Sequence, residues 1–285
     1  MTGTREEQRS ETGQRPPPSR HGPVAQLLIA WSPLSLILIA YAAADWVATT
    51  IVVGDPGDQA NRLGFALHVT APAAADRHVF GAVPSVWLQD RLVDGSVHWY
   101  DALAALVYLT HFVTIPVMTA LVWFRFWDRF TSWLAAVLAF TTVGVGGYVV
   151  YPAAPPWLAS DMGVVGPVRR ISGLGLDYLH LGALDRLITS GQADSNPVAA
   201  MPSLHAGAAL LVALFLSPVA TRRWRVVLAS YVAAMAATLV YTGEHYVVDV
   251  VAGWATAVLA VAVGVLVHRR VTRPRGRSSR GGLTT

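Results

Sequence analysis

Long apolar segments separated by polar turns occupy most of the 285-residue chain. These segments predict membrane helices, because a helix of about 20 apolar residues crosses the hydrocarbon core of a bilayer. We place six of them at residues 24–53, 102–124, 131–151, 202–220, 226–242 and 245–268. The sequence shows no alternation of apolar and polar residues strong enough to predict a strand. The predicted fold class is therefore all-α, a polytopic membrane helix bundle of about six transmembrane helices.

Polar stretches flank and interrupt the predicted membrane domain, residues 24–268. Residues 1–23 are polar and proline-rich and predict a disordered tail, and residues 269–285 form a basic tail of Arg, Gly and Ser. The first apolar run is too long for the core of a signal peptide, and Pro33 predicts a bend in it. Residues 54–100 mix Trp and Arg with apolar residues, which is typical of interfacial segments. They form either a spacer or a lid over a site.

Composition supports a membrane protein and narrows its chemistry. Apolar residues make up 54% of the chain and charged residues 13%, against about 25% charged residues in soluble proteins. The formal net charge of +4 is carried by arginine alone, and much of the excess lies near the end of the chain. This distribution predicts membrane orientation and not nucleic-acid binding. The absence of cysteine excludes disulfides and thiolate catalysis.

The distribution of arginines predicts the orientation in the membrane. With the N-terminus inside, six of the 21 arginines fall outside, which leaves 15 inside. The six are Arg62, Arg77, Arg91, Arg169, Arg170 and Arg186. The positive-inside rule therefore predicts a multi-pass protein of the cell membrane with both termini cytoplasmic. The same orientation puts the end of the third helix and the starts of the fourth and sixth helices on the outer face.

Two short motifs at those helix starts carry the candidate chemistry. They are Met-Pro-Ser-Leu-His at 201–205 and Gly-Glu-His-Tyr-Val-Val-Asp at 243–249. Four residues separate His245 from Asp249, so on a helix they share one face, and the carboxylate can orient the imidazole. Ser203, at the predicted start of a helix, and the free N–H groups there predict an anion site. An oriented histidine, a second histidine at His205 and an anion site suggest phosphoryl transfer.

The two motifs resemble the second and third motifs of the type-2 phosphatidic acid phosphatase superfamily. Leu204 and the stretch Tyr-Pro-Ala-Ala-Pro-Pro-Trp at 151–157 are most similar to its inositol phosphorylceramide synthase branch, and the resemblance covers a core of about residues 100–265. It implies that His245 is a nucleophile forming a phosphohistidine, that Asp249 orients it, and that His205 protonates the leaving group. It also implies chemistry that needs neither a metal nor another cofactor, on a phospholipid or prenyl phosphate in the bilayer.

The chain departs from this superfamily where the phosphate should be bound. The first motif of the family, a lysine followed by an arginine–proline, is absent, and Leu239 stands where the third motif has an arginine. Other residues on the outer face must therefore contact the phosphate. The candidates for substrate binding are Ser203, Asn196, Arg169, Arg170 and Tyr151.

Several alternatives remain open at the level of sequence. Two histidines and an aspartate could instead hold zinc in a metal-dependent membrane hydrolase, and a non-enzymatic transporter is a further class. Asp101, Tyr108 and His111 recur at helical spacing, either as an interhelical hydrogen-bond network or as a second layer around the site. Hydrolysis and transfer to an alcohol share their first step, so the motifs do not separate them. The oligomeric state is not predicted.

Overall fold

The computed structural model describes residues 22–48, 59–183, 186, 190 and 196–272, and within these the chain forms helices and no β-strand. Most of both predicted tails and the end of the first predicted helix lie outside the described residues. The elements are α1 (Pro23–Trp31), η2 (Ser32–Leu34), α2 (Ser35–Ala48), α3 (Thr70–Phe80), α4 (Pro84–Leu92), α5 (Trp99–Arg125), η3 (Trp127–Arg129), α6 (Phe130–Val150), α7 (Pro156–Asp161), α8 (Leu174–Tyr178), α10 (Leu204–Leu216), α11 (Arg222–Tyr241) and α12 (Val247–Thr272).

Five of the described helical segments are long and apolar enough to cross a membrane: Pro23–Ala48, Trp99–Arg125, Trp127–Val150, Arg222–Tyr241 and Val247–Thr272. A sixth apolar helix, α10, has 13 residues and packs between the others. The predicted all-α bundle of about six helices is thus confirmed. A 3₁₀ turn that includes Pro33 interrupts the first segment, at the position of the predicted bend. The main difference is α10, which is shorter than its predicted span because the chain leaves the helix after Leu216.

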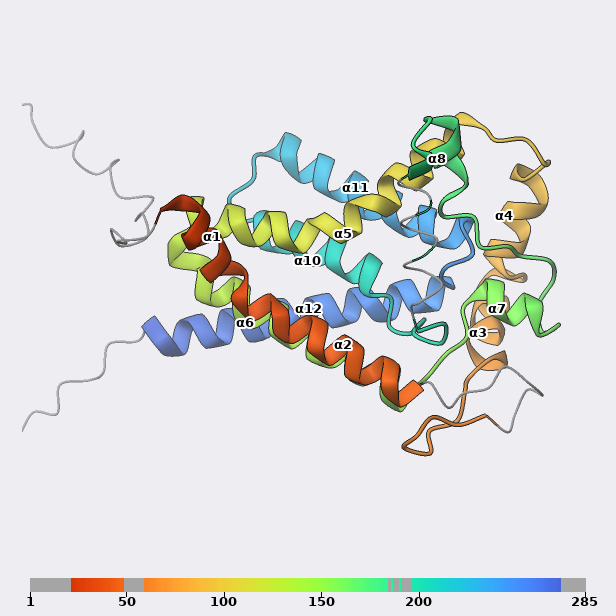
Figure 1. Ribbon diagram of the computed structural model, residues 1–285, viewed down its shortest axis with the longest axis horizontal. Coiled ribbons are helices and arrows are strands. Elements are labelled where there is room, and N and C mark those ends of the chain that lie inside the picture. The colour runs from red at the N-terminus through yellow and green to blue at the C-terminus, as the bar shows by residue number, and fades with distance from the viewer. Residues whose placement is uncertain (1–21, 49–58, 184–185, 187–189, 191–195, 273–285) are drawn as a thin grey trace, which may run out of the picture.

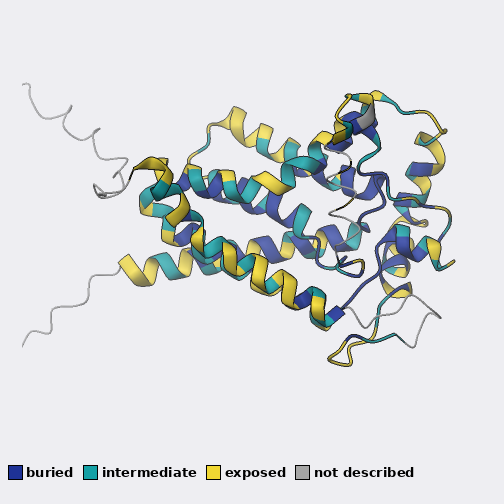
Figure 2. Cartoon of the chain, viewed as in Figure 1, coloured by how far each residue is buried: buried dark blue, intermediate teal, exposed yellow. Residues whose placement is uncertain are grey.

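The long helices run along one axis, and the short helices α3, α4, α7 and α8 gather at one end of the bundle (Figure 1). α10 and α12 begin near this end and α6 finishes there, whereas α1 begins and α12 finishes at the opposite end. The predicted interfacial connection contains α3 and α4, which expose Val79, Phe80 and Trp87. The outward sides of the long helices are also exposed (Figure 2), and apolar residues such as Ile39 and Val117 lie there. Exposed apolar surface of this extent fits a protein surrounded by lipid.

Glycines bring the starts of α10 and α12 into contact. A Cβ atom at Gly253 of α12 would lie 2.1 Å from the carbonyl oxygen of Ser203, and one at Gly207 of α10 would lie 2.7 Å from the carbonyl oxygen of Gly253. The backbone N–H of Ser203 donates a hydrogen bond of 2.9 Å to the carbonyl oxygen of Asp249. Small residues at a helix crossing allow this close approach of two backbones in a membrane. The crossing therefore fixes the two sequence motifs against each other.

Replacing Gly253 with alanine should force α10 away from α12, since the added methyl group meets a backbone oxygen that cannot rotate aside. We expect a loss of stability of about 1–3 kcal/mol, measured as a lower unfolding temperature in detergent. Gly146→Ala on α6 is the matched control, because nothing lies within 4 Å of its added Cβ atom. Equal unfolding temperatures for the two variants would contradict this account of the crossing.

Candidate active site

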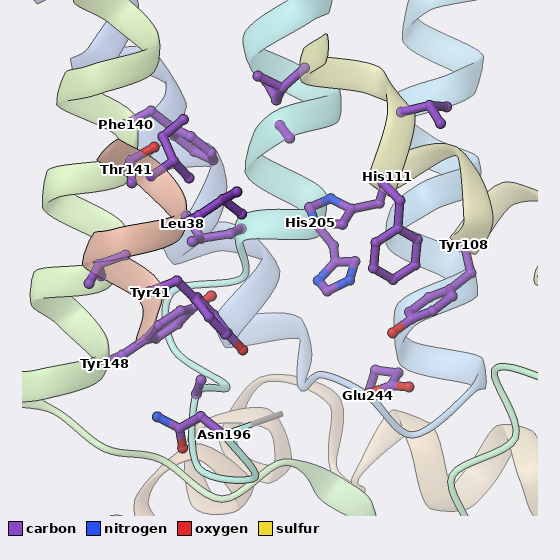
Figure 3. A pocket seen from close by; sticks show the side chains of 18 of the residues that line it. Leu38, Tyr41, Tyr108, His111, Phe140, Thr141, Tyr148, Asn196, His205 and Glu244 are labelled. Atoms are coloured by element: carbon purple, nitrogen blue, oxygen red, sulfur yellow. The ribbon is translucent and has the colours of Figure 1, made fainter. Parts of the chain in front are cut away.

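A cavity of about 1390 Å³ lies between the first membrane segment and helices α5, α6 and α10 (Figure 3). Most of its wall is apolar, with Leu38, Ile115 and Phe140 among the lining residues. Polar side chains line it near the starts of α10 and α12, and they are Arg170, Asn196, His205, Glu244 and His245. The cavity therefore joins a long apolar chamber to a compact polar end that includes both motif histidines.

His245 lies just before α12, and Asp249 lies in the first turn of that helix. The Nδ1 atom of His245 is 3.6 Å from the Oδ2 atom of Asp249, and both side chains are buried. The same carboxylate oxygen accepts a hydrogen bond of 2.9 Å from the backbone N–H of Tyr246. The sequence predicted a pair on one helical face. In the structure, His245 lies before the first residue of α12, after a left-handed turn at Gly243. The pair therefore spans the start of the helix and does not lie along one of its faces. The carboxylate still faces the imidazole.

His205 occupies the first turn of α10 and faces the cavity. Its ring centroid is 5.7 Å from that of His245, close enough for one phosphoryl group to contact both rings. Its Nε2 atom is buried and has no hydrogen-bond partner among the described residues. Ser203 is the N-cap of α10, and its hydroxyl accepts a hydrogen bond from the N–H of Ala206. Two motifs about forty residues apart thus present two histidines to one space.

The start of α12 is capped from α3, a helix far away in the sequence. The buried carboxylate of Asp76 accepts hydrogen bonds of 2.9 Å from the N–H of Val247 and 3.0 Å from that of Val248. Burial raises the pKa of Asp76, and the two backbone hydrogen bonds oppose this shift. Capping by a carboxylate satisfies free N–H groups and favours the helix dipole. Asp76 therefore positions the segment that carries His245, and no spacing pattern along the chain points to this role.

Arg170 and Glu244 form a partly buried ion pair at the polar end of the cavity. The Nε atom of Arg170 donates a hydrogen bond of 2.9 Å to the Oε1 atom of Glu244, which also accepts one of 2.6 Å from the hydroxyl of Ser172. Burial lowers the pKa of Arg170, but the charge and hydrogen bond of Glu244, together with Tyr108, raise that pKa above its usual value. The guanidinium also lies 5.4 Å above the ring of Trp157. Among the described residues of the cavity wall it is the one arginine.

The remaining predicted substrate-binding residues divide into two groups. Asn196 lines the cavity, and its Oδ1 atom accepts a hydrogen bond from the N–H of Val198. Ser203, Arg169 and Tyr151 are not part of the described cavity wall. Arg169 is exposed and Ser203 is fully buried, while the ring of Tyr151 stacks on His68 at 3.7 Å. Of the two neighbouring arginines, Arg170 therefore lines the cavity and Arg169 does not.

Asp101, Tyr108 and His111, the three residues of α5 that recur at helical spacing, differ in their contacts. Asp101 accepts a hydrogen bond of 2.5 Å from the hydroxyl of Tyr241 on α11, so it belongs to an interhelical network. Tyr108 and His111 line the cavity and contact the ring of His205. Both alternatives raised by the sequence therefore apply, each to different residues. In the described part of the chain, no group of three or more His, Asp or Glu side chains is arranged to hold a metal ion.

Apolar spans around a cavity with two facing histidines define a multi-pass membrane protein with a histidine-based site. The chain belongs to the PAP2 superfamily, whose model matches residues 73–263. This confirms the resemblance seen in the two motifs, and it makes the protein a phosphatase or phosphotransferase enzyme of lipid metabolism. The transporter alternative is therefore not favoured.

Two similar proteins are named as synthases. The phosphoinositol dihydroceramide synthase of Bacteroides thetaiotaomicron is 28% identical over 251 residues, which cover 83% of this chain and 76% of that protein. The inositol phosphorylceramide synthase catalytic subunit aur1 of Schizosaccharomyces pombe is 34% identical over 119 residues, covering 41% of this chain and 28% of that protein. No solved structure matches this chain.

Replacing Asp76 with asparagine should weaken the cap of α12, because an amide offers one acceptor oxygen where the carboxylate offers two. A buried N–H left without a partner costs about 1–3 kcal/mol. We expect a lower unfolding temperature and a lower kcat, measured in detergent with a phospholipid substrate. Asp90→Asn on the neighbouring helix is the control, since the Asp90 side chain is 79% exposed. If both variants behave like the parent, Asp76 does not position α12.

Proposed function

We propose that this protein is a membrane phosphotransferase that moves a phosphorylated head group from one lipid to the hydroxyl of another. The observation that carries the proposal is the cavity, which has a volume of about 1390 Å³ and a mostly apolar wall. Two histidines line its polar end. Pockets for a single small ligand usually measure about 300–1,000 Å³. The larger volume favours two lipid chains in succession or together. The names of the two relatives suggest a phosphoinositol group and a ceramide-type acceptor.

In the first step, the Nε2 atom of His245 attacks phosphorus and the bond from phosphorus to the lipid oxygen breaks. Asp249, 3.6 Å from Nδ1, stabilises the positive charge that develops on the ring. Protonated His205 gives its proton to the departing lipid oxygen. The products are a phosphohistidine, which carries the head group, and a lipid alcohol.

In the second step, the hydroxyl of the acceptor lipid attacks phosphorus and the bond to Nε2 of His245 breaks. His205 takes the proton of that hydroxyl, so both histidines return to their starting states. Water in place of the acceptor would give hydrolysis. An apolar chamber that excludes water and aligns a lipid hydroxyl favours transfer.

Arg170 is the proposed cation for the phosphate, in place of the missing first motif. It lines the cavity beside Glu244, the residue that precedes the nucleophile, and its ion pair keeps the guanidinium charged and oriented. Charged donors already in place stabilise the oxygens of a reacting phosphoryl group. Asn196 lies on the same wall and offers an amide. Ser203 supports this site from outside the cavity wall as the N-cap of α10, whereas Arg169 and Tyr151 do not line the cavity.

The proposal predicts a covalent intermediate on His245. After incubation with a phospholipid labelled in its head group, the parent should carry label that survives alkali and is lost in acid. His245→Ala should carry none, and His205→Ala and Asp249→Asn should turn over at least about a hundredfold more slowly. His78→Ala, an exposed histidine on α3, is the control. Turnover of His245→Ala at the parent rate would exclude this nucleophile.

The products and the effect of a chelator separate the remaining alternatives. With dihydroceramide present, transfer gives a labelled lipid, whereas a phosphatase releases free head-group phosphate or phosphate at an unchanged rate. Full turnover in EDTA is expected for the histidine mechanism, and loss of turnover would favour the metal-dependent alternative.

The proposed site faces the extracytoplasmic side. The chain contains no cysteine, so single cysteines report orientation without background. We expect Asp161→Cys, exposed at the end of α7, to react with an impermeant maleimide on intact cells. Arg223→Cys, exposed in the first turn of α11, should react only after the membrane is opened. The reverse pattern would place the site and its lipid substrates on the cytoplasmic side.

A further inference from the structure

A third histidine lies in the cavity, and the proposed chemistry does not use it. His111 comes from the middle of α5, and its ring centroid is 3.8 Å from that of His205, with an angle of 31° between the rings. The two rings lie side by side in Figure 3. An ionisable residue at this depth in a membrane protein is costly and usually functional.

The surroundings of His111 leave one ring nitrogen without a partner. Its Nδ1 atom is buried and accepts or donates no hydrogen bond within the described residues. The cavity wall that α5 contributes beyond this point is apolar, with Phe112, Val113 and Ile115. A buried polar atom without a partner costs free energy that a polar ligand in the cavity would recover. His111 therefore offers a polar group where the apolar chamber meets the polar end of the cavity.

The position next to His205 limits what that ligand can be. In the proposed mechanism, His205 contacts the lipid oxygen that leaves in the first step and the hydroxyl that attacks in the second. A group that forms a hydrogen bond with Nδ1 of His111 therefore belongs to the lipid whose hydroxyl contacts His205. On that lipid it lies a few bonds from the reacting hydroxyl, where the apolar chain begins. An imidazole nitrogen can donate or accept, depending on the tautomer.

We propose that His111 selects the acceptor, by a hydrogen bond from its ring to an amide or second hydroxyl beside the reacting hydroxyl of a long-chain lipid. This inference rests on the proposed function and adds a residue that sets acceptor specificity. It separates N-acylated amino alcohols from simple long-chain alcohols, which have no such group. The ring of Tyr108, on the same helix, also stacks on that of His205, with 5.2 Å between their centroids, and helps to hold it in place.

Two substitutions separate hydrogen bonding from ring stacking. His111→Phe keeps an aromatic ring against His205 and removes both nitrogens. His111→Asn removes the ring and places an amide near the position of Nδ1. His78→Phe on α3, an exposed position that does not line the cavity, is the control for a histidine replaced by phenylalanine. The acceptors compared are dihydroceramide and a primary alcohol of the same chain length, each offered with the same labelled phospholipid donor.

For dihydroceramide we expect His111→Phe to lower kcat/KM by about tenfold to a hundredfold, the range for a lost buried hydrogen bond. The simple alcohol should lose less than about threefold by the same reasoning. Labelled phosphohistidine should accumulate in His111→Phe when dihydroceramide is the acceptor, because only the second step is slowed. His111→Asn should recover part of the discrimination between the two acceptors.

The contrary results are distinct. If the parent forms phosphohistidine but His111→Phe slows transfer to both acceptors alike, or His111→Asn is the more damaged variant with dihydroceramide, His111 acts by packing and the inference fails while the proposed function stands. Absence of phosphohistidine in the parent overturns the proposed function and this inference together.

Discussion

The hydrogen bond from the N–H of Ser203 to the carbonyl oxygen of Asp249 joins the two helix starts that form the site. It can form because Gly253 has no side chain where the Ser203 backbone passes. A contact between two backbones is stiffer than one between side chains, since neither partner can change rotamer. The relative position of His205 and His245 thus depends on the helix crossing more than on any contact between the histidines themselves.

Sequence patterns indicated the fold and the two motifs because both are local signals. Apolar run lengths predict spans, and the spacing from His245 to Asp249 predicts a pairing that a single turn of chain can make. Asp76 gave no such signal, because its partners Val247 and Val248 are 171 and 172 residues away. Arg169 and Arg170 looked equivalent for the same reason. Only the packed structure places one in solvent and the other against Glu244.

Charge in the polar end is balanced within the protein before any substrate binds. Arg170 is paired with Glu244, and Asp249 faces His245, so these four residues form two pairs of opposite groups. A buried pair costs less than a buried single charge, which allows the site to exist in an apolar cavity. The phosphate of a lipid then enters a site that is polarised but not strongly positive. Such a site suits a substrate that must leave again as readily as it arrives.

The stretch that matches the PAP2 superfamily begins at residue 73, yet part of the cavity wall comes from before it. Leu34, Leu38 and Tyr41 of the first membrane segment line the apolar chamber, while the histidines come from within the matched stretch. Part of the apolar chamber is therefore encoded outside the stretch that carries both histidines. Mutation in the first segment could change which lipids fit without disturbing the catalytic groups, a simple evolutionary route from one substrate to another.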